Sequence, residues 1–362
     1  MRWAVGAAIL AMVASACGAA RPAQGVALAR AQARAAGFLG CMVTDTGGID
    51  DRSFNASSWQ GMLAAHAADH SITVKYLQSS SASDYVPNIT SFERQHCGII
   101  VTVGFLMATA TQNAAKADSK QRFATVDYTY PRMSNLLGIH YQTDQDAFLG
   151  GYLAAAMSKS GVVGTFGGID IPTVTIYMTG FVAGVRYYDL HRHAHVKVLG
   201  WTPSKSNPLD GTGIFTGSFT SQADGRLAAT TLMHDGADII FPVAGSVGLG
   251  AAAAVKAAGR PNYMEWVDTD GCVSAPQYCG IFITSVTKGI VASVKAAVLA
   301  AAHGTFKGGN YNGTLANNGV GLSPFHDFAK RIPRSVQREL KVLQQGIIKG
   351  TISVNPNRYP VG

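Results

Sequence analysis

Residues 38–59, FLGCMVTDTGGIDDRSFNASSW, join an apolar strand pattern to a loop rich in glycine and aspartate and then to the start of a helix pattern. This order continues along the chain, because nine further apolar runs are typical of strands and helix-like stretches lie between several of them. The strand-like runs are ITVKYL, GIIVTVG, RFATVDY, LLGIHY, GVVGTFG, VKVLGW, DIIFPVA, YMEWVDT and GIFITSV. The helix-like stretches cover residues 57–68, 148–159, 222–234, 249–258 and 288–303. Sustained alternation predicts an α/β fold with parallel sheets that helices cover on both faces.

Two lobes account for this number of strands better than one. Ten strand-like runs are too many for one small sheet, and the pattern starts again near Gly161. We therefore expect two doubly wound parallel-sheet lobes. The first comprises residues 38–141 and about 284–325, and the second about 142–283 and about 326–355. Ligands of such folds bind beyond the carboxyl ends of the strands, so we expect the site in a cleft between the lobes.

The amino terminus has the features of an export signal. Arg2 gives a positive start, and the apolar run 3–13 is too short to span a bilayer as a helix. The run ends in Ala14-Ser15-Ala16-Cys17, which resembles a lipobox, where signal peptidase cleaves before a cysteine that receives lipid. We expect a signal peptide at 1–16 and lipid on Cys17. An ordinary signal cleaved nearby is the alternative.

Residues 17–37 are predicted to be a tether. From residue 18 they contain nine alanines and three arginines without an acid. Arginines close to an anionic membrane favour it by about 1 kcal/mol each, and a plain solvated linker is the alternative. No later stretch reaches the roughly 18 uninterrupted apolar residues of a membrane span. We expect a lipid-anchored protein on the extracytoplasmic face of the cell membrane, at the cell surface or in the periplasm.

The charge of the chain bears on its partners. The formal net charge is +8, and removal of residues 1–16, whose only charged residue is Arg2, leaves +7. Lysines and arginines are not clustered among aromatic residues, and only 14% of the residues are charged. We therefore expect no nucleic acid as a partner. We also expect a monomer that holds no cofactor or metal.

Four cysteines remain once Cys17 is assigned to lipid. Cys41 and Cys97 begin two strand-like runs, and neighbouring parallel strands would bring them within disulfide distance. Cys272 and Cys279 can close a short loop, and their C-x6-C spacing is not typical of zinc sites. Because disulfides persist in exported proteins, we expect both pairs.

Functional side chains follow several strands at the edge where a ligand would bind. Three carboxylates and one lysine arrive there, next to a phenylalanine and a glycine. These strand ends deliver Asp45, Phe105, Asp127, Gly245, Asp268 and Lys288. Each acid alone can be explained as a helix cap or a turn residue. Their shared placement predicts a polar binding site.

Six blocks of the chain carry a more specific pattern. The blocks are DTGGIDDRSFNASSWQGM, FATVD, GGIDIPTVTIYMTGFVAGV, GSFTSQADGRLAATTLMHDGADIIFPVAGSVGLG, VDTD and TSVTKGIVASV. In order and spacing they resemble the basic membrane protein family, the purine nucleoside receptor A-like lipoproteins. The resemblance implies a type I periplasmic binding fold. It also implies a receptor that captures nucleosides, purines in particular, for the permease and ATPase subunits of an ABC importer.

The resemblance also implies roles for single residues. Its S-F-N motif corresponds to Ser53, Phe54 and Asn55, with Phe54 stacked on the base and Asn55 at the edge of the base. Gly245 and its neighbours would line the other lobe. The ribose and its surroundings are implied for Asp127, Asp268 and Lys288.

The chemistry of a nucleoside fits these residues. A flat base needs stacking, and ribose hydroxyls need acceptors, which a carboxylate supplies through charge-assisted hydrogen bonds. The acids would repel phosphate, which favours a nucleoside over a nucleotide. The second aromatic wall of the base is not assigned by the sequence, with Phe181, Phe241 and Trp201 as candidates, so purine against pyrimidine preference stays open.

The loop 45–51 also comes close to D-T-D-P-G-x-D-D, the calcium-binding signature of nucleoside hydrolases. Gly47 stands where that loop needs an aspartate, and Gly48 stands where it has a proline. Calcium takes six to eight oxygen ligands, so the loss of a carboxylate matters. We expect a receptor rather than an enzyme. A calcium-dependent nucleoside hydrolase, a sugar-binding receptor and a sensory receptor are the alternatives.

Overall fold

The computed structural model of the chain describes residues 37–360. The predicted signal peptide, Cys17 and the tether up to residue 36 lie outside the described residues. Within residues 37–360, no helix is long and apolar enough to cross a membrane.

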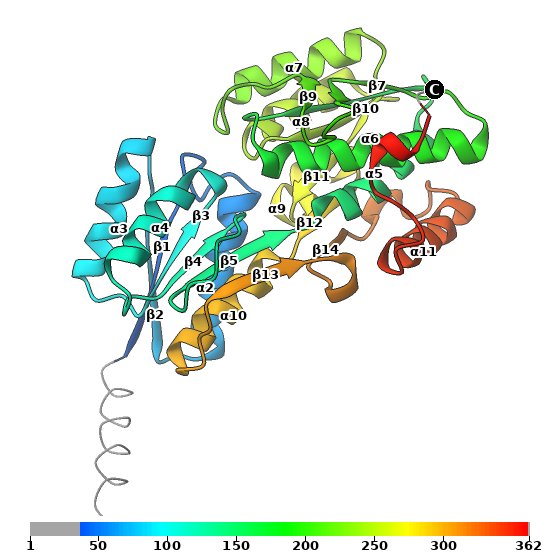
Figure 1. Cartoon of the computed structure of the whole chain (residues 1–362). Helices are drawn as coiled ribbons and strands as arrows, with labels where there is room; N and C mark the ends of the chain where they lie inside the picture. The colour runs from blue at the N-terminus through cyan, green and yellow to red at the C-terminus, as the bar shows by residue number, and fades with distance from the viewer. Residues whose placement is uncertain (1–36, 361–362) are drawn as a thin grey trace, which may run out of the picture. The chain divides into compact units, whose positions relative to one another are not determined.

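Two six-stranded sheets form the centres of two lobes (Figure 1). The sheet of lobe 1 has the order β13 (Gly309–Gly313), β5 (Leu136–Tyr141), β4 (Phe123–Val126), β3 (Ile99–Val103), β1 (Phe38–Val43) and β2 (Ile72–Leu77). The sheet of lobe 2 has the order β14 (Val320–Leu322), β12 (Phe282–Lys288), β11 (Tyr263–Asp268), β10 (Ile239–Val243), β6 (Val162–Gly167) and β7 (Lys197–Leu199). A separate hairpin pairs β8 (Trp201–Pro203) with β9 (Gly211–Gly213). The predicted two-lobed α/β fold is confirmed.

All neighbouring strands of the two large sheets run parallel except β12 and β14, which are antiparallel. Central strands of parallel sheets are covered on both faces and therefore have continuous apolar sequences. β3 and β10 follow this rule, since every residue of both strands is buried.

Helices cover both faces of each sheet. The longer helices are α2 (Phe54–Ala68), α3 (Tyr85–Arg94), α4 (Ala108–Ala117), α5 (Thr143–Met157), α6 (Pro172–Arg192), α7 (Gln222–His234), α8 (Val247–Ala258), α10 (Ile290–Ala302) and α11 (Arg334–Ile348). The short ones are η1 (Ala82–Asp84), η2 (Phe105–Met107), α9 (Gly271–Ser274), η3 (Pro276–Ile281), η4 (Leu315–Asn317), η5 (His326–Phe328) and η6 (Pro356–Arg358). In lobe 1, α3 and α4 lie on one face of the sheet, and α2 and α10 lie on the other (Figure 1).

Alternating side chains of β1 show how the sequence produces these layers. Successive residues of a strand point to opposite faces of its sheet. Cys41 and Val43 accordingly belong to the core cluster under α3 and α4, while Met42 belongs to the cluster under α2 and α10.

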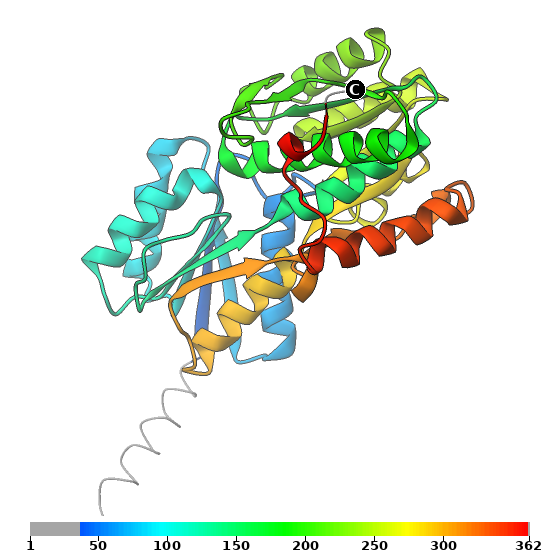
Figure 2. The ribbon, with the colours of Figure 1, turned by 45° about the vertical axis from the view of Figure 1, so that its right-hand side comes forward.

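Glycines allow α5 and α6 to pack closely in lobe 2, where the two helices lie side by side (Figure 2). A Cβ on Gly151 of α5 would lie 2.0 Å from the carbonyl oxygen of Phe181, and a Cβ on Gly184 of α6 would lie 2.0 Å from that of Phe148. No side chain fits at either position. Buried residues of both helices belong to one apolar core cluster.

The chain passes between the lobes three times, after β5, after β12 and after β13. The sheet assignment differs from the expected lobe boundaries. Residues 284–325 were expected in lobe 1, but β12 and β14 hydrogen-bond in the sheet of lobe 2. The part of this segment in lobe 1 consists of α10, which packs on α2, and β13, which pairs with β5. The apolar pattern of β12 does not indicate which of two similar sheets it enters.

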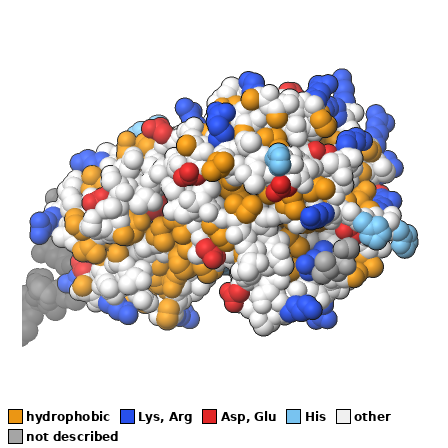
Figure 3. Space-filling view, turned by 90° about the horizontal axis from the view of Figure 1, so that it is seen from above, with side chains coloured by type: hydrophobic (Ala, Val, Ile, Leu, Met, Phe, Trp, Pro, Cys, Tyr) orange, Lys and Arg blue, Asp and Glu red, His pale blue; other side chains and the backbone are white. Residues whose placement is uncertain are grey.

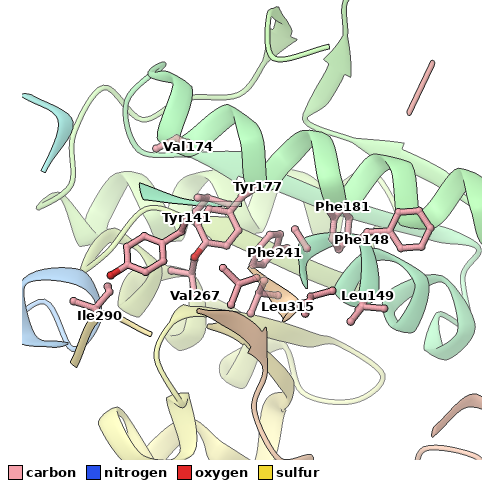
Figure 4. Close-up of a cluster of buried hydrophobic side chains, with 14 of the residues drawn as sticks. Tyr141, Phe148, Leu149, Val174, Tyr177, Phe181, Phe241, Val267, Ile290 and Leu315 are labelled. Atoms are coloured by element: carbon pink, nitrogen blue, oxygen red, sulfur yellow. The ribbon is translucent and has the colours of Figure 1, made fainter. Parts of the chain in front are cut away.

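Three aromatic residues considered for the wall of the site lie in the core of lobe 2 instead. Phe181 and Phe241 are fully buried and stack with ring centroids 5.4 Å apart (Figure 4). Trp201 is also buried, and its indole nitrogen donates to Thr179 Oγ1 at 3.1 Å. Their apolar surface is used in packing, so none of them is free to stack on a ligand.

Both predicted disulfides are confirmed. Cys41 and Cys97 are joined with their Cα atoms 5.9 Å apart, next to the paired strands β1 and β3. Cys272 and Cys279 are joined with their Cα atoms 4.5 Å apart and close a short loop in lobe 2.

Candidate functional site

A cavity lies between the two lobes, at the edge where the strands of both sheets end. Lobe 1 contributes residues that follow β1, β3 and β4, and lobe 2 contributes residues at the ends of β10, β11 and β12. The space inside the cavity and its mouth is about 510 Å³. This value includes the open space at the mouth, so the nature of the ligand is inferred from the residues that line the cavity.

The strand order explains why the cavity forms at this place. The order changes direction between β1 and β3 in lobe 1, and between β6 and β10 in lobe 2. Loops that leave two such strands turn to opposite faces of the sheet and leave a crevice between them. Asp45 follows β1, Gly104 follows β3 and Gly245 follows β10, and all three line the cavity. The crevices of both sheets therefore contribute to one cleft.

One lysine binds two carboxylates in the wall of the cavity. Lys288, the last residue of β12, places Nζ 2.6 Å from Oδ2 of Asp127 and 3.2 Å from Oδ1 of Asp268. Asp127 follows β4 in lobe 1 and Asp268 ends β11 in lobe 2, so this group connects the lobes. All three side chains are less than a tenth exposed. Buried charges are tolerated when they compensate one another in this way.

Asp127 and Asp268 occupy equivalent places in the two lobes. β4 and β11 hold the same position in the two sheet orders, and each aspartate lies at the carboxyl end of its strand. Both have a φ of 67°, in the left-handed region that aspartate tolerates better than most residues. Such a backbone costs free energy and is often found at functional sites.

Asp268 is held by groups from both lobes. Ser53 Oγ of lobe 1 lies 2.8 Å from Oδ2 of Asp268 and 3.1 Å from the carbonyl oxygen of Val267, while Tyr177 donates its hydroxyl to Oδ1 at 3.1 Å. Ser53 is fully buried and does not line the cavity. Its hydroxyl therefore ties lobe 1 to the end of β11.

Lys288 and the two aspartates each stabilise the charged form of the other. Burial alone lowers the pKa of Lys288, but the carboxylates of Asp127 and Asp268 outweigh burial and hold that pKa above its usual value. Burial raises the pKa of Asp127 to about 6, and Lys288 limits the rise. At pH 7 the lysine is protonated and Asp127 is mainly ionised.

Asp51 fixes the start of α2, which carries two cavity residues. Its carboxylate accepts the backbone N–H groups of Ser53 at 2.9 Å, Asn55 at 2.8 Å and Ala56 at 3.0 Å. These donors are free at the first turn of a helix, and a carboxylate there is favoured. Burial raises the pKa of Asp51 to about 7 against the effect of these bonds. The acid positions Phe54 and Asn55 at the cavity.

Asn55 is oriented by two acids. Its Nδ2 donates to Oδ1 of Asp45 at 2.9 Å and to Oδ2 of Asp51 at 3.3 Å. Oδ1 of Asp45 also accepts the N–H of Gly47 at 3.0 Å. Burial raises the pKa of Asp45. The buried Oδ1 of Asn55 has no hydrogen-bond partner among residues 37–360.

Aromatic side chains from both lobes form the apolar part of the wall. Phe54 and Phe105 of lobe 1 and Tyr177 and Phe219 of lobe 2 line the cavity. Nζ of Lys288 lies 4.9 Å from the ring centroid of Phe54 and 5.0 Å from that of Tyr177, within cation–π range. The cavity therefore combines aromatic faces with hydrogen-bonding groups.

The cavity is acidic although the chain is basic. Four carboxylates and one ammonium group line it, so its charge is opposite in sign to the formal net charge of +8. Lys and Arg are interspersed with Asp and Glu on the molecular face in Figure 3.

Seven of the eight predicted ligand-binding residues line this cavity, and Ser53 lies directly behind it. The seven are Asp45, Phe54, Asn55, Asp127, Gly245, Asp268 and Lys288. Sequence reasoning missed Tyr177 and Phe219 as cavity residues. Tyr177 lies in α6 among apolar residues and gives no sign of its position. Phe219 lies in the quoted GSFTSQADG block, whose loop before α7 is the available signal.

Two clusters of acidic and sulfur- or nitrogen-bearing side chains resemble metal sites, and both make other contacts. In the calcium-like loop, Asp50 is exposed, and the carboxylate of Asp51 accepts backbone N–H groups. Asp270, Cys272 and His326 lie close together, but the sulfur of Cys272 is in a disulfide. His326 Nε2 lies 2.7 Å from Oδ2 of Asp270, which also caps α9 through Oδ1. These contacts account for both clusters without an ion.

Sequence comparison finds relatives along nearly the whole described chain. A CD4+ T-cell-stimulating antigen of Listeria monocytogenes is 29% identical over 333 residues, which cover 88% of each chain. A protein of Lactococcus lactis named ABC transporter nucleoside-binding protein BmpA is 29% identical over 300 residues, which cover 78% of this chain and 80% of that protein.

Solved structures show the same fold. A solute-binding protein of an ABC transporter system from Aeropyrum pernix K1 superposes with a TM-score of 0.78 at 23% identity, covering 87% of this chain and 92% of that one. The Bmp family, described as ABC transporter substrate-binding protein PnrA-like, matches residues 38–207 and 214–358. The chain therefore belongs to the Bmp family of PnrA-like substrate-binding proteins of ABC transporters.

Proposed function

We propose that this protein binds a nucleoside in the interlobe cleft and delivers it to an ABC importer. One observation carries the proposal: the group of Asp127, Lys288 and Asp268 joins the lobes beside the ring of Phe54. Hydroxyl-binding groups and a stacking face thus lie next to each other. A nucleoside consists of the two matching parts, a ribose and a flat base.

The ribose would bind at the acid–lysine–acid group. A carboxylate accepts hydrogen bonds from adjacent hydroxyls, and such charge-assisted bonds are about twice as strong as neutral ones. Asp127 and Asp268 supply these acceptors from different lobes, and Lys288 supplies donors to ribose oxygens. Because each lobe contributes, a ribose in this place would favour the closed arrangement of the lobes.

The base would bind between aromatic side chains. Phe54 belongs to lobe 1 and Phe219 to lobe 2, and both line the cavity. Stacking on an aromatic side chain typically contributes about 1 to 3 kcal/mol per base. Asn55 is placed by α2 at the same wall as Phe54 and would contact the edge of the base.

Charge supports a nucleoside over a nucleotide. Asp127 and Asp268 would repel a phosphate group, and Lys288 is already paired with both of them. An uncharged ligand avoids this repulsion.

The partners of this protein can be proposed from one of its relatives. The Lactococcus lactis relative is named a nucleoside-binding protein of an ABC transporter. By analogy, we propose that permease and ATPase subunits are the partners of this chain. We also propose that it is exported, held on the extracytoplasmic face of the membrane by lipid on Cys17, and monomeric.

Calorimetric titration tests the ligand class. The full chain would be titrated with adenosine, guanosine, inosine, cytidine and uridine, and separately with ribose and glucose. The proposal predicts saturable binding of at least one nucleoside and much weaker binding of the sugars. Binding of a free sugar without binding of any nucleoside would favour a sugar receptor and refute the proposal.

We propose further that the protein is not a nucleoside hydrolase. In support, the oxygens of Asp51 are engaged by the start of α2, and Gly47 offers no side chain to a calcium ion. Incubation with inosine and calcium, followed by chromatography for free hypoxanthine, tests this. Release of hypoxanthine at enzymatic rates, lost in the variant Asp45→Asn, would show a hydrolase.

A further inference from the structure

We propose that Asn317 is a positioning residue that stabilises the closed arrangement of the two lobes and thereby increases the affinity for a ligand in the cleft. It lies in the loop 314–319, which joins β13 of lobe 1 to β14 of lobe 2 (Figure 1). The inference rests on the proposed nucleoside function in one respect, because nucleoside binding is used to measure lobe closure.

The two ends of this loop touch although they belong to different lobes. Gly313 is the last residue of β13, which pairs with β5, and Gly319 directly precedes β14, which pairs with β12. A Cβ on Gly319 would lie 2.2 Å from the Cα of Gly313, so no side chain fits there. Because the strands on either side are held in their sheets, the separation of these glycines is coupled to the angle between the lobes.

The side chain of Asn317 fastens the loop to both of its ends. Its Oδ1 accepts the N–H groups of Thr314 at 2.8 Å and of Gly319 at 3.0 Å. Its Nδ2 donates to the carbonyl oxygen of Asn312 in β13 at 2.9 Å. If the amide were turned over, its NH2 group would face two N–H donors, so these contacts fix its orientation.

The other two crossings between the lobes are hydrogen-bonded to the same pair of glycines. After β5, the N–H of Gln142 donates to the carbonyl oxygen of Gly313 at 2.8 Å. After β12, the N–H of Gly289 donates to the carbonyl oxygen of Gly319 at 2.8 Å. Lobe rotations are absorbed by a few residues at the ends of elements, and here all three crossings meet at these two glycines.

The loop itself is attached to lobe 2. Oε1 of Gln145 in α5 accepts the N–H of Leu315 at 3.0 Å, and Leu315 is buried in the same core cluster as residues of α5. The loop therefore moves with lobe 2. It follows that, of the three hydrogen bonds of Asn317, the one to Asn312 joins the lobes.

This bond affects affinity because the ligand contacts lie on both lobes. In the structure the lobes touch across the cleft, where Asp127 of lobe 1 binds Lys288 of lobe 2. The apparent affinity of a ligand falls with the fraction of molecules that adopt the arrangement competent for binding. A hydrogen bond between the lobes that is lost on opening raises this fraction, and the bond from Asn317 to Asn312 is of this kind.

Calorimetric titration of the full chain with adenosine, guanosine, inosine, cytidine and uridine tests the inference. Asn317 is exposed, so its replacement leaves the core intact. Asn317→Ala removes all three hydrogen bonds, and we expect the affinity for each bound nucleoside to fall about five- to thirtyfold. Asn317→Asp keeps an acceptor for the two N–H groups of the loop but cannot donate to Asn312, so it should cause a similar loss. Wild-type affinity in either variant would overturn the inference.

Asn207→Ala is a matched control. Asn207 is also exposed and also fastens a loop, since it accepts the N–H of Leu209 at 3.3 Å and donates to Oδ2 of Asp210 at 2.9 Å. That loop joins β8 to β9 within lobe 2, so the change should leave the affinity within about twofold of the wild type. A loss equal to that of Asn317→Ala would mean that any disturbed loop lowers affinity, which would overturn the inference.

Small-angle X-ray scattering adds a readout of lobe closure. With saturating nucleoside, Asn317→Ala should have the same radius of gyration as the wild type, because the ligand still closes the cleft once it is bound. A larger radius in the saturated variant would show that Asn317 shapes the closed form instead of stabilising it, and would overturn the inference.

The outcomes separate the role of Asn317 from the proposed function. If nucleosides bind and the Asn317 variants keep the wild-type affinity, the function stands and only the role of Asn317 fails. If ribose or glucose binds in place of any nucleoside, the function fails, and the same comparison of variants is made with that sugar. If none of these ligands binds to the wild-type chain, both fail.

Discussion

Replacement of Lys288 by methionine should lower the free energy of unfolding. The loss should be smaller when one of the acidic partners of the lysine is neutralised as well. Methionine keeps most of the volume of lysine and removes the charge. Nζ of Lys288 lies 2.6 Å from Asp127 and 3.2 Å from Asp268, and the side chain is 3% exposed. Removal of one partner from a buried ion pair typically costs about 3 to 5 kcal/mol, because a buried charge is left uncompensated. We expect a decrease of this size in the free energy of unfolding at pH 7.

A double-mutant cycle separates the charge effect from packing. Urea unfolding would be measured for the wild type, Lys288→Met, Asp127→Asn and the double variant. In the double variant one of the two stranded carboxylates is neutral, so its loss should be smaller than the sum of the single losses by about 1.5 to 3 kcal/mol. The control Lys341→Met alters an exposed lysine of α11 and should change stability by less than about 0.5 kcal/mol. Additive losses, or a Lys288→Met variant as stable as the wild type, would refute the argument.

Four further predictions concern other parts of the molecule. Phe54→Ala should weaken nucleoside binding by about 1 to 3 kcal/mol in calorimetry, and an unchanged affinity would show that the ring does not stack on the base. Nucleoside affinity should fall as the pH is lowered through about 6, because burial raises the pKa of Asp127 to about 6 and protonation removes an acceptor. Affinity that stays constant between pH 8 and pH 5 would contradict this. Glu265 is fully buried without a hydrogen bond from residues 37–360, and burial raises its pKa from 4.5 to about 8. The neutral carboxyl thus contributes stability that is present below pH 4.5 and lost as the pH rises through about 8. Glu265→Gln should abolish this loss, on the order of 4 kcal/mol in urea unfolding, and the same pH dependence in both proteins would refute it. The double variant of Cys41 and Cys97 to serine should lose about 4 kcal/mol, because the disulfide closes a loop with a sequence separation of 56, and a loss below about 1 kcal/mol would contradict that account.

Within residues 37–360, the sequence predicted ten strands and missed β8, β9, β13 and β14, which have three to five residues each. Each of the ten strand-like runs corresponds to a strand, because central strands of a parallel sheet require continuous apolar residues. β13, with the sequence GNYNG, lies at the edge of its sheet and has little apolar surface to reveal it. β9, with the sequence GTG, is fully exposed. Neither burial nor periodicity marks such short edge strands.

The sequence predicted those residues of the site that lie at the ends of apolar strands. Asp127 and Asp268 are expected at one edge because each lies at the carboxyl end of an apolar strand pattern, which the sequence shows. Phe219 and Tyr177 lie in a loop and in an apolar helix, where position depends on tertiary packing. The sequence also did not predict which lobe contains β12, because its apolar pattern is compatible with the sheet of either lobe. The orientation of Asn55 depends on contacts with Asp45 and Asp51 that no spacing rule provides.

The central claim is that one cleft holds a ribose and a base together, with acids from both lobes on the sugar. Titration of the full chain with guanosine, and separately with ribose and with guanine, tests it most directly. We predict that guanosine binds at least a hundredfold more tightly than either part, and that Asp268→Asn removes most of this advantage. Ribose or guanine alone binding as tightly as guanosine would contradict the account.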